Sequence, residues 1–212
     1  MSDTLSRPIH ATELGIQPRS HSVVGYIKYY DLERYLFEEV HHRFHAEQSL
    51  SAFDFFSIVI WKANRAKSKI ARRLLHCADP HCDDLDAIVH SLTAQLHAAP
   101  DSKDRLRILL CDWGFKLPMA TAILTVLWPD DFTVYDTRIC KQLGGFHDLY
   151  NRTNFERIWE GYEVFVARIR NETPEGLSLR DQDRFLFGKS TALQLEQDII
   201  RLFQPNNEED SQ

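Results

Sequence analysis

Apolar residues recur along this chain at intervals of three and four, the spacing of helices that bury one side. The pattern predicts amphipathic helices over residues 27–46 and 84–98, and a strongly apolar helix over residues 52–61. Ser51 with Asp54 three residues later is close to a capping box, which favours helix over strand for that apolar segment. We find no segment with the alternating pattern of a strand and no internal repeat, so the fold class predicted is all-α.

The C-terminal third continues this helical pattern. The sequence Thr153-Asn154-Phe155-Glu156 is a capping box that predicts the start of a long helix, ending at residues 172–176. Ser178, with an aspartate three residues on, predicts the next helix, and residues 192–203 predict a separate last one. With 212 residues, of which 43% are hydrophobic, the chain can bury a sizeable core.

Both ends of the sequence look like polar tails, over residues 1–20 and 205–212, on either side of one helical domain over residues 21–204. No apolar run reaches the roughly 18 residues of a membrane span, and neither end has the pattern of a signal peptide. We therefore expect a cytoplasmic protein that does not bind membranes, and a monomer.

The most informative stretch covers residues 102–144. It predicts a helix, a tight hairpin, a second helix and a short loop before a third helix. Gly114 permits a positive φ in the hairpin, and Pro118 is pre-set for the first turn of a helix, whose free amides would point outward toward an anion. Residues 119–128 carry no charge, so the second helix should be buried on most sides, and Pro129 ends it.

This order resembles the helix-hairpin-helix DNA glycosylase superfamily, whose hairpin reads roughly L-P-G-V-G-x-K-T-A and whose catalytic aspartate follows in a V-D-T-H-like segment. Laying Ala120-Thr121-Ala122-Ile123-Leu124 on the start of the family's helix places Gly114-Phe115-Lys116 on the G-V-G turn and Asp136-Thr137-Arg138 on the D-T-H segment. Pro118 and Asp136 are then 18 residues apart (136 − 118), the family's spacing from lysine to aspartate. Only one of the turn's glycines is kept, and Pro118 occupies the lysine position.

The resemblance implies a two-lobed helical bundle with a degenerate helix-hairpin-helix. A hairpin lobe would span about residues 62–144, and both ends of the chain would form a second lobe. It also implies a monofunctional DNA glycosylase, in which Asp136 stabilises an oxocarbenium-like sugar and activates water without cutting the strand. A gapped alignment would return Lys116 to the nucleophile's position, although a direct contact with a phosphate is the simpler role for this lysine.

Two alternatives remain open at this stage. Aspartate is among the best N-cap residues, so Asp136 could simply begin a helix. The protein would then be a noncatalytic helix-hairpin-helix module that binds DNA or a protein partner, and the missing lysine and glycines favour this alternative. The net negative charge also permits a helical protein that does not touch DNA.

A basic segment lies upstream of the hairpin. Residues 62–73 contain six Lys and Arg residues and no acid, in a chain whose formal charge is −6. Attraction to double-stranded DNA must therefore be local, although a solvated helix face would have the same composition. The segment Lys62-Ala63-Asn64-Arg65 resembles the glycosylase loop that fills the gap left by a flipped base. The predicted DNA contacts are Lys62, Asn64, Arg65, Lys69, Arg72, Gly114, Phe115, Lys116, Ala120 and Arg138.

The cysteines and histidines give no cofactor. No cysteine follows Cys140, so the four-cysteine iron–sulfur cluster of some glycosylases is not expected. Residues 76–82 hold four potential zinc ligands, but all come from one short segment, and we expect no metal there. Cys111 and Cys140 should be reduced core residues. His41 and His45 share a helix face without the glutamate of an H-E-x-x-H motif, which indicates a surface cluster.

Overall fold

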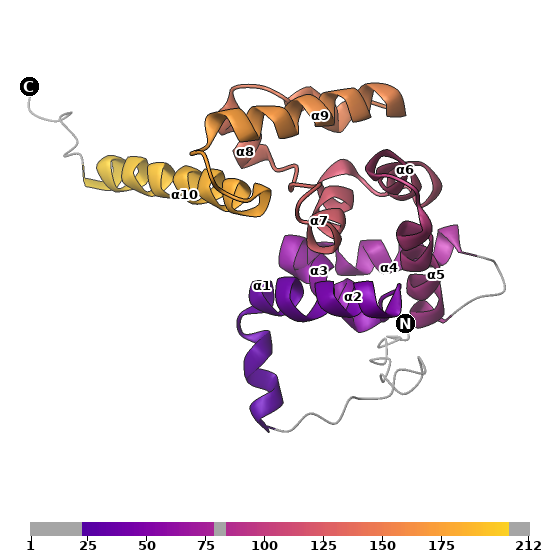
Figure 1. Ribbon diagram of the computed structural model, residues 1–212. Coiled ribbons are helices and arrows are strands. Elements are labelled where there is room, and N and C mark those ends of the chain that lie inside the picture. Colours follow the sequence, from indigo (N-terminus) through magenta and orange to yellow (C-terminus); the bar gives the residue numbers. More distant parts are fainter. Residues whose placement is uncertain (1–22, 79–83, 204–212) are drawn as a thin grey trace, which may run out of the picture. The chain divides into compact units, whose positions relative to one another are not determined.

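Helices form all the regular structure in the described part of the chain, which confirms the prediction of an all-α protein. This computed structural model describes residues 23–78 and 84–203 (Figure 1). The predicted tails, residues 1–20 and 205–212, lie outside these ranges. Among the helices described, none combines the length and the apolar character that crossing a bilayer requires.

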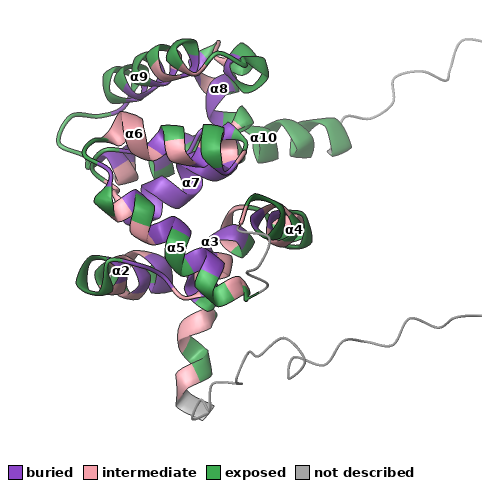
Figure 2. Cartoon of the chain, turned by 90° about the vertical axis from the view of Figure 1, so that its right-hand side faces the viewer, coloured by how far each residue is buried: buried purple, intermediate pink, exposed green. Residues whose placement is uncertain are grey.

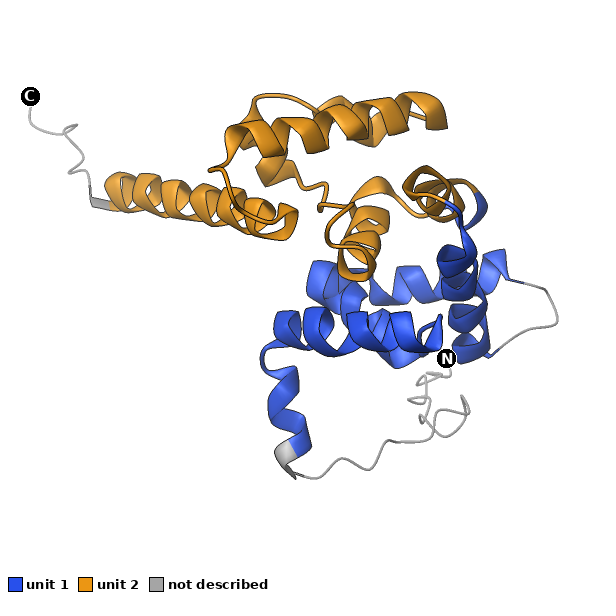
Figure 3. Ribbon diagram, in the orientation of Figure 1, with its two compact units in different colours: residues 1–100, 112–114 blue, residues 101–111, 115–212 orange. Residues whose placement is uncertain are grey.

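The chain divides into two compact units (Figure 3). Unit 1 comprises residues 1–100 and 112–114, and unit 2 comprises residues 101–111 and 115–212. The resemblance implied a different division, with a hairpin lobe over about residues 62–144. The observed boundary follows from packing, because the helix before residue 64 packs against the two helices after it.

Unit 1 is a set of short helices around one apolar helix, α3. After a 3₁₀ helix, the chain forms a continuous helical segment over residues 32–47 with π geometry in its middle, so the helix predicted over residues 27–46 begins later than expected. The bounds are η2 Val23–Tyr29, α1 Leu32–Arg34, η3 Tyr35–Val40, α2 His41–Glu47, α3 Ala52–Ala63, η4 Asn64–Ala66, α4 Lys67–Cys77 and α5 Leu85–Ala98.

Helix α3 begins as its sequence predicts, and a buried acid fixes it to the preceding helix. The Ser51 side chain accepts a hydrogen bond from the Asp54 amide at 3.3 Å. The Asp54 carboxylate, only 1% exposed, accepts hydrogen bonds from the Tyr35 hydroxyl at 2.6 Å and from Arg43 Nε at 3.0 Å. Because both carboxylate oxygens are paired, this charge is tolerated in the interior.

Unit 2 contains the hairpin helix α7 and the two longest helices of the described chain. Most of α7 is buried, as its uncharged sequence predicts (Figure 2). Helix α10 packs against α8 and α9 through its N-terminal half. The bounds are α6 Ser102–Arg107, η5 Ile108–Asp112 (whose last residue belongs to unit 1), α7 Leu117–Leu127, α8 Thr137–Leu143, η6 His147–Asn151, α9 Phe155–Glu172 and α10 Leu179–Phe203.

Three local predictions were wrong. The N-cap of α9 is Asn154, whose side chain accepts from the Arg157 amide at 3.0 Å, and not the residue before it. Two helices were predicted where α10 is continuous, because Gly188 in the interior of a helix costs only about 1 kcal/mol and no proline interrupts the segment. Cys111 is exposed, unlike the buried Cys140, because it lies on the outer side of η5.

Candidate functional site

The hairpin turn is built around Gly114, which adopts a φ of 61°, as predicted. The Gly114 carbonyl accepts a hydrogen bond from Arg73 Nη1, and a Cβ on Gly114 would lie 2.6 Å from that nitrogen. The neighbouring Trp113 donates from its indole to Gln95 at 3.2 Å, while its carbonyl accepts from the Cys77 thiol at 3.7 Å. The positive φ therefore favours glycine here, and a Cβ would also displace the end of the Arg73 side chain.

The amides that were predicted to hold a phosphate are largely used inside the protein. Met119 and Ala120 both donate to the Lys116 carbonyl at 3.0 Å, and Phe115 donates to the Leu109 carbonyl at 2.8 Å. Pro118 has no N–H to offer. Three of the amides expected to be free for an anion are thus hydrogen-bonded within the protein.

Among the predicted contact residues of the hairpin, one side chain is both exposed and positively charged. Phe115 and Ala120 are 3% and 0% exposed, so neither side chain is accessible to DNA. Lys116, at the N-cap position of α7, is exposed. Any attraction of this turn for a phosphate therefore depends mainly on the ammonium group of Lys116.

Asp136 is half-buried at the start of α8. Its side chain accepts a hydrogen bond from the Arg138 amide at 2.9 Å, so it is the N-cap of this helix, as the sequence predicts. The Arg138 guanidinium is exposed and lies 5.2 Å from the centre of the Phe187 ring of α10. The capping bond fixes the orientation of the carboxylate relative to the helix.

The segment before Asp136 is fastened to two helices of unit 2. The Tyr135 amide donates to Thr121 Oγ1 of α7 at 3.0 Å, and the Tyr135 hydroxyl donates to the Phe146 carbonyl at 2.7 Å. The Tyr162 hydroxyl of α9 both accepts from the Thr133 amide at 3.0 Å and donates to the Thr133 carbonyl at 2.6 Å. Burial raises the pKa of both tyrosines, so these hydroxyls keep their protons and remain donors.

The sequence did not predict these hydrogen bonds between residues 133–135 and the helices α7 and α9. Their signal was the presence of Thr121, one of two threonines in an otherwise apolar helix, because a buried hydroxyl needs a partner and can accept a hydrogen bond from a nearby amide. Tyr162 lies within the long helix that the sequence predicts after residue 154. Its hydroxyl, which periodicity cannot interpret, makes the two bonds to Thr133.

The predicted basic residues of unit 1 form a surface on α4 and the turn before it. We call Arg65, Lys69 and Arg72 the basic α4 face; all three are exposed, and the opposite side of α4 buries Ile70 and Leu74. Within the described residues the basic α4 face makes no ion pair, and its only hydrogen bond joins Arg72 Nε to the Ser68 carbonyl at 3.3 Å. These charges remain available for a phosphate.

The other predicted residues near this face are placed less favourably. Lys62 is half-buried at the end of α3. Asn64 is exposed in the η4 turn, where its side-chain oxygen accepts from Lys67 Nζ at 3.0 Å. Arg73, the last basic residue of the segment 62–73, donates instead to the Gly114 carbonyl.

The predicted site residues fall into two sets. Unit 1 holds Lys62, Asn64, the basic α4 face and Gly114. Unit 2 holds Phe115, Lys116, Ala120, Asp136 and Arg138.

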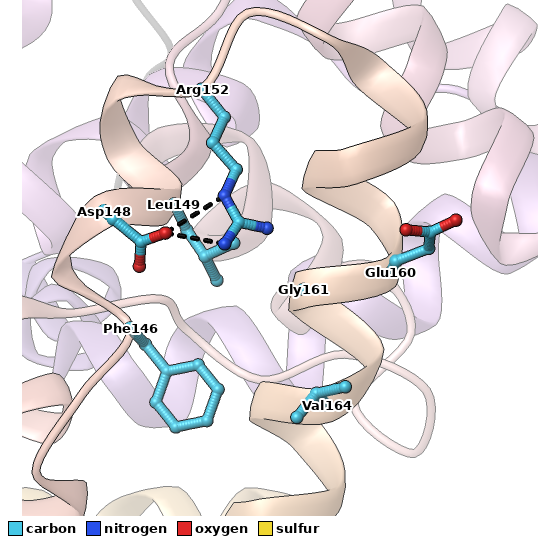
Figure 4. Close-up of a pocket in the computed structure, with 7 residues that line it drawn as sticks. All are labelled: Phe146, Asp148, Leu149, Arg152, Glu160, Gly161 and Val164. Carbon is cyan, nitrogen blue, oxygen red and sulfur yellow. Dashed lines mark hydrogen bonds and ion pairs between the residues drawn. The ribbon is translucent and has the colours of Figure 1, made fainter.

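Unit 2 also contains a pocket that the sequence did not predict (Figure 4). It encloses about 440 Å³ between the η6 segment and α9. Its cation, Arg152, pairs with Asp148 at 2.6 Å and donates to the Arg157 carbonyl at 2.8 Å. That pairing lowers the pKa of Asp148. A Cβ on Gly161 would meet Leu149 at 2.2 Å, so the glycine serves close packing. Arg152 and Asp148 are paired with each other, and a second carboxylate, that of Glu160, also lines the pocket.

Three histidine side chains lie close together in unit 1. His41 and His45 do share a helix face, with ring centres 4.6 Å apart, and His97 lies 6.3 Å from His45. Among the described residues, no group of three or more side chains could hold a metal ion. The segment considered for zinc lies partly outside the described residues, at residues 79–83.

No family model, curated protein or solved structure matches this chain.

Proposed function

We propose that this protein binds double-stranded DNA and hydrolyses the N-glycosidic bond of a damaged or mispaired base, with Asp136 as the catalytic carboxylate. The observation that carries the proposal is the bond of the Tyr135 amide to Thr121 of α7. It joins the aspartate segment to the hairpin helix, so that a phosphate contact near Lys116 and the carboxylate of Asp136 would keep a fixed relation. Thr121 is five residues beyond Lys116, or about 7.5 Å along the helix axis.

The main catalytic group that hydrolysis of an N-glycosidic bond requires is a carboxylate held next to the sugar. When the base leaves, positive charge develops on the sugar, and a nearby carboxylate stabilises it and orients water for attack. The N-cap bond and the buried hydroxyls around residues 133–135 hold Asp136 before substrate arrives, which reduces the reorganisation needed during the reaction.

DNA would be attracted by the basic α4 face and by Lys116. The rest of the chain repels phosphate: six of its 25 basic residues lie in residues 62–73, which leaves 19 basic and 31 acidic residues elsewhere, a formal charge of −12. Each lysine or arginine that neutralises a phosphate should contribute about 0.9 to the slope of log affinity against log salt concentration.

A second candidate is a noncatalytic DNA-binding module. It is favoured by the hydrogen bonds of Met119 and Ala120 to the Lys116 carbonyl, which remove the amides that grip the strand in the family, and by Pro118 at the lysine position. In this candidate Asp136 acts only as an N-cap.

Duplexes that each carry one damaged base or one mismatch separate the two candidates. After incubation, hot alkali converts abasic sites into strand breaks. We expect wild type to yield alkali-dependent breaks with at least one substrate, and Asp136→Asn to lose them while keeping its helix, because asparagine also caps. Asp101→Asn is the matched control, since Asp101 caps α6 in the same way, accepting from the Asp104 amide at 2.8 Å.

The outcomes are distinct. Equal activity of wild type and Asp136→Asn would refute the role of Asp136. Breaks without alkali would indicate a lyase and return Lys116 as the nucleophile. Salt-dependent binding without any cleavage would favour the noncatalytic module.

Binding is tested separately from catalysis. Lys69→Ala and Arg72→Ala should each flatten the salt dependence of DNA affinity by about one unit of slope, uniformly across sequences. Arg170→Ala removes an exposed charge from α9 in unit 2 and should leave the slope unchanged. If the Lys69 and Arg72 variants match wild type, DNA does not bind the basic α4 face.

A further inference from the structure

The C-terminal half of α10 exposes a row of large apolar side chains. Leu195, Ile199 and Leu202 are 59%, 47% and 78% exposed, and every residue from 191 to 202 is exposed (Figure 2). Monomeric proteins rarely leave a contiguous row of this kind uncovered.

The row has the spacing of a coiled-coil seam. Its members follow one another at intervals of three and four residues, the first and fourth positions of a heptad. Leu179, Leu186 and Ser190 are buried on the packed side of α10. At 100° per residue, the row lies on the opposite side of the helix. The seam consists of Phe185, Gly188, Ala192, Leu195, Ile199 and Leu202.

We propose that the seam pairs with the α10 seam of a second copy of this chain, in antiparallel orientation, to form a two-fold symmetric dimer. Antiparallel pairing matches small residues with large ones. Gly188 meets Ile199 of the second copy, Ala192 meets Leu195, and Phe185 meets Leu202 at each end. Parallel pairing would instead set Gly188 and Ala192 against themselves and leave gaps in the middle of the seam.

The charges beside the seam favour the same orientation. Lys189 and Glu196 each follow a seam residue, and the antiparallel arrangement places Lys189 of one copy near Glu196 of the other, twice by symmetry. The parallel arrangement places Arg184 near Lys189 of the second copy, a repulsive pair. A dimer replaces the monomer expected from sequence, and this proposal does not depend on the proposed reaction with DNA.

The first test is the mass of the full chain in solution. Sedimentation equilibrium should show a shift from 24.8 kDa toward twice that value, 49.6 kDa, as concentration rises. Leu195→Lys should raise the dimer dissociation constant at least tenfold. The matched control Gln194→Lys adds the same charge at an exposed position off the seam and should dimerise like wild type. Circular dichroism would verify that both variants keep their helix content.

The orientation is tested by exchanging charges. Lys189→Glu and Glu196→Lys should each weaken the dimer, and the double variant should restore it. In a parallel dimer Lys189→Glu would instead strengthen pairing, because Arg184 would then face an acid. The proposal is overturned by that strengthening, by a wild-type mass of 24.8 kDa at concentrations up to roughly 1 mM, or by equal weakening in Leu195→Lys and Gln194→Lys.

Discussion

The two hydrogen bonds of the Tyr162 hydroxyl should make Tyr162→Phe one of the most destabilising isosteric substitutions in unit 2. The hydroxyl both accepts from and donates to the backbone of Thr133, and the two residues are 1% and 0% exposed. Phenylalanine keeps the ring and its stacking near Phe132, whose ring centre is 6.1 Å away. The substitution therefore removes the polar contacts and little else.

The magnitude follows from the two groups left behind. The Thr133 amide and carbonyl would both be buried without a partner, because no water can reach them in a tightly packed interior. An unsatisfied buried group costs about 1–3 kcal/mol, so the free energy of unfolding should fall by roughly 2–6 kcal/mol for the two groups. For a chain of this length that corresponds to about 4–24 °C in melting temperature.

Urea unfolding followed by circular dichroism would measure this loss. Tyr150→Phe is the control, because it also removes a phenol oxygen, from a side chain that is 48% exposed, and should stay within about 0.5 kcal/mol of wild type. If Tyr162→Phe were as stable as Tyr150→Phe, the segment before Asp136 would not be held by these bonds. A crystal structure or hydrogen exchange at Thr133 would then show what holds it.

Three further predictions concern stability. Burial raises the pKa of three phenols, so the folded state retains protons that the unfolded chain releases above pH 10. The phenols' contribution to stability should therefore be constant below pH 10, and stability should fall above pH 10 by up to about 1.4 kcal/mol per pH unit for each phenol, measured as the urea midpoint against pH; the phenols are Tyr35, Tyr135 and Tyr162. Gly114→Ala should cost at least about 1–2 kcal/mol from its positive φ alone, whereas Gly145→Ala, with open space around its Cβ, should cost less than half as much in the same assay. Asp54→Ala should cost about 1–3 kcal/mol by thermal or urea unfolding, because it leaves the buried Tyr35 hydroxyl without its acceptor and the half-buried Arg43 without its carboxylate; a loss below about 1 kcal/mol would contradict the geometry.

Local signals in the sequence predicted most helices and the key backbone features of the hairpin. Ser51 and Asp136 cap helices as their types suggest, because the short polar side chain can reach an amide two or three residues on. The positive φ of Gly114 also followed from sequence, since few other residues tolerate it. These features are decided within a few residues of chain.

What the sequence did not predict depends on partners far along the chain. Arg73 donates a hydrogen bond to the Gly114 carbonyl, 41 positions along the chain. The Tyr135 amide donates to Thr121, which is 14 positions away. A basic residue at helical spacing cannot reveal whether its charge faces solvent or a carbonyl. Arg73 and Lys69 both belong to the basic segment 62–73, yet Arg73 bonds the Gly114 carbonyl while Lys69 is exposed.

The distribution of charge along the chain makes the basic α4 face important for the proposed attraction of DNA, although the face has only three residues. Because the chain outside residues 62–73 carries a formal charge of −12, electrostatic attraction of a DNA duplex would depend on residues 62–73, together with Lys116. Arg73 and Lys67 are partly occupied by Gly114 and Asn64, so the attraction rests on a few cations. Binding that depends on so few charges against such a background should be weak at physiological salt and sensitive to each of them. If the protein is a glycosylase, specific contacts with the substrate base would have to supply most of its affinity for DNA. A noncatalytic module would instead need a second copy on the same duplex to bind tightly.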